Sequence, residues 1–436
     1  MWNRKHGEKQ IKKGNLLMDE AHLLQVQKLI AENPPKEFEG MQLEKAFTYP
    51  LLDFTSKSLI QELKVLFSPI LKEHYQIAQK GTDGKIFLFG LSYSNRMDHL
   101  KKFENIVSLF SDSTEIIPKK GICFKNFLYI WKVPLWAKKY KPFFKTNGLY
   151  RYVAYLFFHS YCQLQEVKKF EKKIGKVNMF VSWCDVHLSD FIATQYFNHK
   201  GIPTATLQHA HFDIYDSIQK WAYINTPSKY FLCYGDYTAE RAEKLGVPKE
   251  KLIPLGMPEQ IGVQLPIEMK KSNTNIFGVS LSFITQKEEN IALLQAADYL
   301  CNQYNLKCYI RPHPALDMKD YSEYIKRNME IQSVQESMNQ FIDKCDFVVL
   351  GTSDVYLTLI SNLIPVFRYC QNQERDRFET MNWSTFNSVH QLIEYYELFL
   401  NNPQWMEKNL IVMRNKILAK GNPTENYFNF LSGFDN

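Results

Sequence analysis

The sequence predicts an α/β protein built from two doubly wound domains, and three observations support this fold class. The chain has 436 residues, which is too long for one ordinary hydrophobic core. Short apolar runs alternate with helical stretches twice along the chain, as in parallel sheets that helices cover on both faces. A polar segment without clear periodicity, residues 259–275, separates the two alternations, and we interpret it as an interdomain linker.

The first alternation predicts an N-terminal doubly wound domain over residues 81–262. Its short apolar runs predict strands over residues 85–90, 177–183, 204–208, 230–234 and 252–256. Helical stretches between them cover residues 190–199 and 238–245. Apolar residues also recur at helical intervals from residue 15 to residue 80, which predicts a helical N-terminal extension over residues 1–80.

The second alternation predicts a C-terminal doubly wound domain over residues 274–400, followed by helices over residues 401–436. Strands are expected over residues 276–279, 307–310, 347–350 and 365–367, and helices over 288–304, 321–328, 337–344 and 354–361. We expect the two domains to face each other across a cleft. Ligands of such sheets bind beyond the carboxyl ends of the strands.

The charge of the chain is unevenly distributed. From Ile116 to Gln165 there is no Asp or Glu, but there are eight lysines and one arginine. The rest of the chain sums to −2, the overall +7 less this local +9. Because Trp131, Trp136 and other aromatics lie among Lys138, Lys139 and Lys141, we expect residues 116–165 to face an anionic membrane or a lipid-linked acceptor.

Two alternatives for this segment are a solvated basic face over an aromatic core and a nucleic-acid surface. No recognised binding motif accompanies the charge, so we expect no nucleic-acid partner. The basic start of the chain lacks the apolar core of a secretory signal. No apolar run approaches the roughly 18 residues that a spanning helix needs. We therefore expect a cytoplasmic protein, peripheral at the inner face of the cell membrane.

Polar motifs follow two strands of the predicted C-terminal domain. Arg311-Pro312-His313-Pro314 follows the strand at 307–310, and its prolines restrict the backbone around two side chains that suit a phosphate. Gly351, Thr352 and Ser353 lie where a strand turns into a helix, a position suited to an anion. Ser282 lies in the polar loop after the first strand of this domain. It is a third candidate for the same site, with a weaker sequence signal. These residues are the predicted donor site.

Histidines and a carboxylate end two strands of the predicted N-terminal domain. Asp185, His209 and His211 are candidates for the general base that deprotonates an acceptor hydroxyl. Structural histidines, or a zinc site that also uses Cys184 and His187, are the alternatives. The sequence has no Asp-x-Asp triplet, so we expect a metal-independent reaction in which Arg311, His313 and the Ser353 turn carry the charge of the leaving group.

These motifs resemble those of bacterial surface and capsular polysaccharide transferases with the GT-B architecture. The similar pieces are Leu207-Gln208-His209, Arg311-Pro312-His313-Pro314, and Gly351-Thr352-Ser353 running on to Ile364-Pro365-Val366-Phe367. A His-Pro motif followed by paired hydroxyls is similar to sialyl- and Kdo-transferases, and a histidine in each domain is similar to CDP-glycerol polymerases. Many of these relatives have Gly where this chain has Ala210.

The resemblance implies a GT-B-like fold of two Rossmann-type domains and a glycosyltransferase. The enzyme would move a sugar from a nucleotide sugar to a lipid-linked or growing surface polysaccharide, with His313, Thr352 and Ser353 holding the donor phosphate. No cofactor is expected, because the nucleotide sugar or CDP-alcohol enters as a substrate. Alternatives are a CDP-polyol phosphotransferase, a sugar-nucleotide epimerase, and a non-catalytic assembly protein.

Overall fold

The computed structural model describes residues 20–52, 59–71, 74–79, 87–90, 97–110, 114–119, 122–144, 148–174, 177–208, 224–270, 274–333, 335–371 and 379–434. These residues form two compact units. The first unit holds the described residues up to 208, from 224 to 262 and from 421 to 434, and the second holds those between 263 and 420. No helix in these ranges is both long and apolar enough to span a membrane.

The first unit is built on a sheet whose described strands run in the order β1–β3–β2–β4–β5–β6–β7. The strands are β1 (His74–Gln79), β2 (Phe87–Gly90), β3 (Thr114–Lys119), β4 (Met179–Ser182), β5 (Thr204–Leu207), β6 (Tyr230–Cys233) and β7 (Leu252–Pro254). Only the pairing of β1 with β3 is antiparallel among them. The strand order reverses between β2 and β4, as in a doubly wound sheet.

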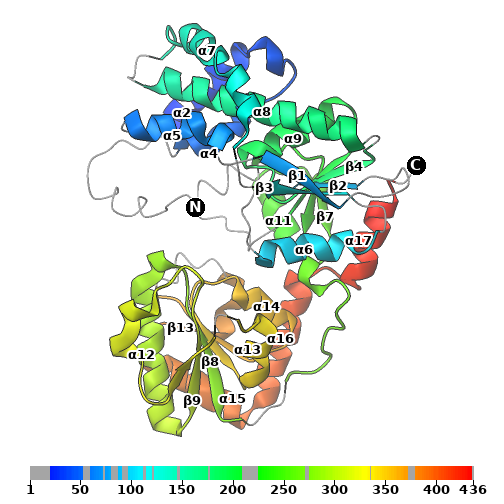
Figure 1. Ribbon diagram of the computed structural model, residues 1–436. Helices are drawn as coiled ribbons and strands as arrows, with labels where there is room; N and C mark the ends of the chain where they lie inside the picture. Colours follow the sequence, from blue (N-terminus) through cyan, green and yellow to red (C-terminus); the bar gives the residue numbers. More distant parts are fainter. Residues whose placement is uncertain are drawn as a thin grey trace. The chain divides into compact units, whose positions relative to one another are not determined.

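Strand β4 shows why the strands of this sheet appear as continuous apolar runs in the sequence. Met179 and Val181 share a core with Phe103 of α6 (Met97–Val107) and with α17 (Pro423–Ser432). Phe180 points to the opposite face and stacks on Phe197 of α9 (Leu188–His199), with ring centroids 5.0 Å apart. Figure 1 shows α6 and α17 on one side of the sheet and α9 on the other. A strand between two apolar layers cannot alternate between apolar and polar residues.

Eight further helices of the first unit form a second core beside the sheet. They are α2 (Glu20–Glu32), η2 (Lys36–Phe38), α3 (Leu43–Ala46), α4 (Thr48–Leu52), α5 (Leu59–Leu71), η3 (Phe124–Tyr129), α7 (Lys132–Tyr140) and α8 (Leu149–Ile174). Helices α11 (Asp236–Lys244) and η4 (Lys249–Lys251) lie against the sheet instead, and η5 (Pro258–Gln260) lies against α6 and α17. Leu23, Phe38 and Phe47 share this core with Phe157 of α8 and Phe191 of α9. The helices expected as an N-terminal extension are therefore part of the first unit.

The second unit is a six-stranded parallel sheet in the order β10–β9–β8–β11–β12–β13. Its strands are β8 (Ile276–Ser280), β9 (Lys307–Arg311), β10 (Met329–Ile331), β11 (Val348–Leu350), β12 (Val366–Tyr369) and β13 (Thr385–Phe386). Counted in chain order this is 3-2-1-4-5-6, the Rossmann arrangement.

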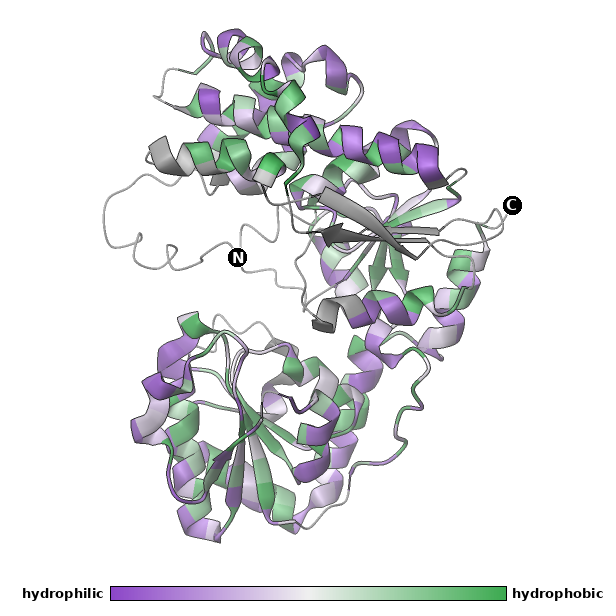
Figure 2. Cartoon of the chain, viewed as in Figure 1, coloured by the Kyte–Doolittle hydropathy of each residue, from purple (hydrophilic) through white to green (hydrophobic). Residues whose placement is uncertain are grey.

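The helices of the second unit cover both faces of its sheet. They are η6 (Ile284–Gln286), α12 (Lys287–Tyr304), η7 (Met318–Tyr324), α13 (Met338–Lys344), α14 (Val355–Ser361), η9 (Glu379–Ser384), α15 (Val389–Asn401) and α16 (Pro403–Ile417). Helix α12 lies on one face, and α13 and α14 lie on the other (Figure 1). Figure 2 shows the matching pattern, with hydrophobic strands inside and a hydrophilic outer surface on α12.

The C-terminal helices are divided between the two units. α15 and α16 belong to the second unit, whereas α17 belongs to the first. In α17, Tyr427 donates a hydrogen bond of 3.3 Å to the carbonyl of Gly256, and Phe428 stacks on Phe110 with centroids 5.5 Å apart. The last helix thus completes the core of the unit that holds the start of the chain.

The structure corrects several predicted elements. Strand β1 lies within the region predicted to be helical up to residue 80, and the helix predicted over residues 321–328 is the 3-10 helix η7. Strands β3, β10 and β13 were not predicted. β10 has three residues and β13 has two, which is too short for any periodicity to be visible.

Candidate functional site

The strand order of the second unit identifies one edge of its sheet as the place for a ligand. The order reverses at β8 and β11, which are hydrogen-bonded neighbours. Rossmann-type sheets bind ligands at the carboxyl ends of the two strands where the order reverses. Ser282 follows β8, and Gly351 and Thr352 follow β11. Two of the three predicted donor loops therefore begin at this point.

One carboxylate joins these two loops. Glu289, in the first turn of α12, accepts hydrogen bonds from Ser282 Oγ at 2.6 Å, from the Thr352 amide at 2.8 Å and from Thr352 Oγ1 at 2.8 Å. Asn290 holds the first loop in place, since its side chain pairs with both the amide and the carbonyl of Ser282. We call Ser282, Glu289, Gly351 and Thr352 the switch-point cluster.

Gly351 allows the close approach that this cluster needs. A Cβ atom at this position would lie 2.1 Å from Glu289 Oε1 and 2.3 Å from its Cδ. Any side chain at residue 351 would therefore occupy the place of the carboxylate. The sequence predicts a tight turn at Gly351. The structure gives a further reason for glycine here, because a Cβ at this residue would collide with Glu289.

The switch-point cluster is an oxyanion-binding arrangement. Two hydroxyls and one backbone amide converge on a single carboxylate, and phosphate oxygens accept hydrogen bonds from the same donors. Glu289 was not among the residues predicted for this site. The only signal was an acidic pair in the first turn of a helix, Glu288 and Glu289, which helix electrostatics alone would explain.

His313 lies beside the loop that follows β8. Its ring meets the ring of Phe283 edge to face, with centroids 5.1 Å apart. The Ala315 amide donates a hydrogen bond of 3.1 Å to His313 Nδ1. Since Nδ1 accepts this bond, the proton of the neutral ring belongs on Nε2, which makes that atom a hydrogen-bond donor.

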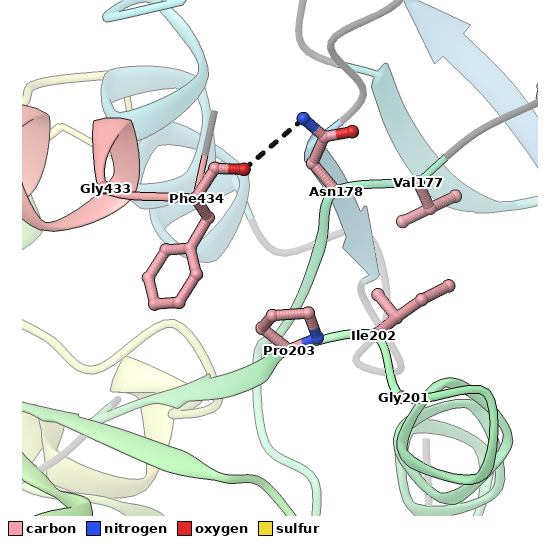
Figure 3. A pocket seen from close by; sticks show the side chains of 7 residues that line it. All are labelled: Val177, Asn178, Gly201, Ile202, Pro203, Gly433 and Phe434. Atoms are coloured by element: carbon pink, nitrogen blue, oxygen red, sulfur yellow. Dashed lines mark hydrogen bonds between the residues drawn. The ribbon is translucent and has the colours of Figure 1, made fainter. Parts of the chain in front are cut away.

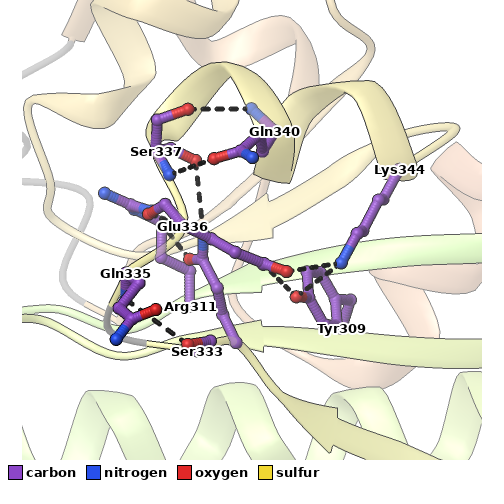
Figure 4. A network of polar contacts seen from close by, with 9 residues as sticks. Tyr309, Arg311, Ser333, Gln335, Glu336, Ser337, Gln340 and Lys344 are labelled. Atoms are coloured by element: carbon purple, nitrogen blue, oxygen red, sulfur yellow. Dashed lines mark hydrogen bonds and ion pairs between the residues drawn. The ribbon is translucent and has the colours of Figure 1, made fainter.

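Arg311 is turned toward α13 instead. Its guanidinium donates to Gln332 Oε1 at 2.7 Å and to the carbonyl of Glu336 at 3.5 Å. Burial lowers the pKa of Arg311, and the Glu336 carboxylate opposes this shift. Figure 4 shows the surrounding network, in which Tyr309 donates to Glu336 and Lys344 pairs with both. These contacts account for Arg311 without a ligand.

Within the described part of the chain, Ser353 has local hydrogen bonds. Its amide donates to the carbonyl of Gly351 at 3.0 Å, and its hydroxyl accepts a long bond of 3.4 Å from the Val355 amide. The half-buried Ser353 stays a predicted ligand residue at the start of α14. Of the residues predicted for the donor site, Ser282, Gly351 and Thr352 share one cluster, and His313 lies against the same loop.

Asp185 lies inside the first unit. Its side chain is 1% exposed and accepts hydrogen bonds from Thr226 Oγ1 at 2.6 Å and from the Ser228 amide at 2.9 Å. Burial raises the pKa of Asp185, although the bonds from Ser228 and Thr226 oppose the shift. Its partners precede β6, so the carboxylate is directed toward the amino end of that strand. His209 and His211 lie outside the described residues.

A further polar group lies at the carboxyl edge of the first sheet. Lys102 of α6 pairs with Glu259 at 2.5 Å and donates to Tyr234 Oη at 3.2 Å. Its ammonium also lies 5.5 Å from the ring centre of Trp183. Trp183 and Tyr234 directly follow β4 and β6. Sequence reasoning missed Lys102 because it lies in a helix distant in the chain from both strand ends.

A pocket lies at the opposite edge of this sheet. It has a volume of about 340 Å³ and is lined by Val177, Asn178, Gly201, Ile202, Pro203, Gly433 and Phe434. Figure 3 shows Asn178 donating to the carbonyl of Phe434, at 3.4 Å. Val177 and Asn178 precede β4, and Ile202 and Pro203 precede β5. The pocket is therefore at the amino ends of the strands, where doubly wound sheets do not bind their ligands.

Comparison with known proteins establishes the fold of the chain. No family model and no curated protein matches the sequence. The structure is similar to S. aureus MnaA solved with UDP, with a TM-score of 0.52 and 10% identity over 79% of this chain and 94% of that chain. It is also similar to UDP-GlcNAc 2-epimerase from Neisseria meningitidis bound to UDP-GlcNAc, with a TM-score of 0.49 and 12% identity over 80% and 99% of the two chains.

A third similar structure is the lipopolysaccharide outer core galactosyltransferase WaaB, with a TM-score of 0.46 and 11% identity over 81% of this chain and all of that chain. Identities this low establish only the fold. The predicted fold class is confirmed by the strand orders of the two sheets and by the similarity to MnaA: the chain is an α/β protein of two Rossmann-type domains, of the GT-B-like class.

Proposed function

We propose that the chain is a metal-independent glycosyltransferase that moves a sugar from a nucleotide sugar to a lipid-linked or growing surface polysaccharide. One observation carries the proposal: Ser282 Oγ and the amide and hydroxyl of Thr352 converge on one anion. Three donors that bind a carboxylate also suit a phosphate oxygen. They lie where a Rossmann-type sheet binds nucleotides.

In the proposed reaction an acceptor hydroxyl attacks the anomeric carbon of the donor sugar. The bond between that carbon and the phosphate oxygen breaks, and the nucleotide leaves with the electron pair. The hydroxyl proton passes to His209 or His211, the two histidines predicted as candidate bases. Ser282, Thr352 and the Nε2 proton of His313 stabilise the charge that develops on the leaving phosphate.

We do not include Arg311 or Asp185 in this machinery. The Arg311 guanidinium binds Gln332 and the backbone of residue 336. The Asp185 carboxylate is buried and accepts bonds from Thr226 and Ser228. In the proposed function Glu289 does not bind the substrate, because a bound phosphate accepts the hydrogen bonds that Glu289 accepts without it. Two unit charges 4 Å apart repel by about 4 kcal/mol at an effective dielectric constant near 20, so Glu289 opposes the incoming phosphate.

The proposal is tested by thermal stabilisation of the full chain with UDP, GDP, CMP, CDP and ADP, each with and without magnesium. A ligand at about 100 times its dissociation constant stabilises the folded state by about 2.7 kcal/mol. We expect a magnesium-independent rise of the midpoint with at least one nucleotide. If no nucleotide raises the midpoint, the proposed function is wrong.

Variants of the switch-point cluster locate the binding site. Ser282→Ala with Thr352→Val should weaken nucleotide binding, whereas Thr358→Val within α14 is the matched control. Glu289→Gln should strengthen nucleotide binding because it removes the repelling charge, and Glu288→Gln, exposed in the same turn, should not. If the cluster variants and their two controls all bind the nucleotide with equal affinity, the nucleotide binds outside the switch-point cluster.

The released nucleotide separates the candidate reactions. Transfer of a sugar from a UDP- or GDP-sugar to an acceptor releases the nucleoside diphosphate. Transfer of a polyol phosphate from a CDP-polyol releases CMP instead, because the attack is at phosphorus. An epimerase changes the sugar without any acceptor. Acceptor-dependent release of the nucleotide with no phosphorus added to the acceptor supports our proposal, whether a UDP- or GDP-sugar releases the diphosphate or a CMP-sugar releases CMP. Release of CMP with phosphorus in the product, or a changed sugar without any acceptor, replaces it.

A further inference from the structure

Exposed apolar side chains gather in one short stretch of the first unit. Ile122, Phe124, Phe127, Leu128, Trp131, Leu135 and Phe143 are between 40 and 70% exposed. They are seven of the nineteen exposed large hydrophobic residues that the described ranges contain. We call these seven residues, with the lysines among them, the η3–α7 surface. Isolated exposed apolar residues need no explanation, but a contiguous group marks an interaction surface.

Helix α7 is apolar on two opposite sides. Val133, Trp136 and Tyr140 are buried and share the core of the helical layer with Phe38 and Phe157. Trp131 and Leu135 are exposed, and their helical positions lie opposite that buried face. Trp136, expected to face a membrane, therefore packs in the protein interior. The exposed stripe has no covering layer among the described residues.

The lysines of this segment surround the exposed stripe. Lys125, Lys138, Lys139 and Lys141 are exposed, and Lys139 also donates to the carbonyl of Pro34 at 2.9 Å. Lys132 is half-buried and pairs with Glu37 at 2.6 Å. No acidic residue occurs between Ile116 and Gln165. The stripe is thus bordered by one sign of charge along its own segment.

We propose that the η3–α7 surface docks the protein on a bilayer that contains anionic lipids. The apolar side chains enter the headgroup region, and the lysines contact lipid phosphates, as in other interfacial amphipathic segments. A second copy of the chain fits less well, because two such surfaces would bring like charges together. A nucleic acid would use the lysines but not exposed aliphatic side chains such as Ile122 and Leu128. The proposal does not depend on the reaction proposed above.

Vesicle co-sedimentation of the full chain tests the proposal. Wild-type protein should bind vesicles of phosphatidylglycerol and phosphatidylcholine, and should bind pure phosphatidylcholine much less. Each lysine near an anionic surface changes the partition coefficient about fivefold, so Lys138→Gln with Lys139→Gln and Lys141→Gln should weaken binding about a hundredfold at low salt. Leu128→Ser with Trp131→Ser and Leu135→Ser should remove binding even at low salt.

The control replaces exposed leucines of the second unit, Leu398→Ser with Leu400→Ser in α15. This variant should bind vesicles as the wild type does, and circular dichroism should show all variants folded. The proposal is overturned if the wild type does not bind anionic vesicles, or if the lysine and apolar variants bind as it does. It is also overturned if sedimentation equilibrium shows a dimer that the apolar variant loses, because the surface would then join two copies.

Discussion

Gly351→Ala tests whether the contact between Glu289 and the loop after β11 holds the switch-point cluster together. The added Cβ would lie 2.1 Å from Oε1 and 2.8 Å from Cγ of Glu289. The carboxylate has to move by about 1 Å or more to reach an ordinary contact distance. This movement stretches its bonds to Thr352 and Ser282, which are 2.6 to 2.8 Å long.

The expected loss of stability follows from these bonds. A hydrogen bond to a charged group contributes about 1.5–3 kcal/mol, and losing one or two of the three gives a destabilisation of about 3 kcal/mol. Gly351 has no left-handed backbone conformation, so alanine by itself is not strained there. In a Glu289→Ala background the Cβ meets no carboxylate, and the same change should cost less than about 1 kcal/mol.

The two variants and their combination form a double-mutant cycle, read from thermal midpoints and from hydrogen exchange at the Thr352 amide. A shift of about 2–4 °C per kcal/mol is expected for a unit of this size. Exchange at Thr352 should accelerate in both single variants and no further in the double variant. If Gly351→Ala costs the same with and without Glu289, the Cβ does not act through the carboxylate and our reading of the cluster is refuted.

Three further predictions concern residues outside the cluster. Arg311→Ala should lower the free energy of unfolding by about 1–3 kcal/mol, because Gln332 loses a charged donor; weaker nucleotide binding at unchanged stability would contradict this. Burial raises the pKa of folded Asp185, so the stability from its proton is present at low pH and lost as pH rises through the folded-state pKa. The free energy of unfolding of Asp185→Asn should therefore rise relative to that of the wild type as the pH increases above about 4. The reverse trend would show that the hydrogen bonds outweigh burial. Ser337 forms a capping box at the start of α13, so Ser337→Ala should lower the thermal midpoint by the equivalent of about 1 kcal/mol, and an unchanged midpoint would mean that water replaces the cap.

The sequence predicts the buried parallel strands well because their environment imposes a pattern. β4 and β11 lie between two apolar layers, so their residues form short continuous apolar runs. β1 and β3 lack this signal. β1, His74–Gln79, has polar residues without strict alternation, and β3 contains Pro118, which sequence reasoning counts against a strand. These two strands pair with each other over a long separation in the chain, which local periodicity cannot reveal.

The residues of the candidate site are predicted unevenly for a related reason. The strand-end rule finds Ser282, Thr352 and His313 because it depends only on where a strand stops. The direction of a side chain depends on what packs against that strand. Arg311 and Tyr309 are two residues apart in β9, so they share a face, and that face carries the Glu336 side chain and α13.

Glu289 is a residue of the site that cannot be predicted even when the strand ends and the side-chain directions are known. Its role depends on Thr352, which is 63 residues away from it in the chain, and on the absence of a Cβ at Gly351. An acidic residue in the first turn of a helix is common for electrostatic reasons alone, so its identity carries no information about the contact. The donors in such a site can be predicted from the ends of strands. The anion that holds them comes only from the packing of a helix against both loops, and in the function that we propose it sets the electrostatic cost that an incoming phosphate has to overcome.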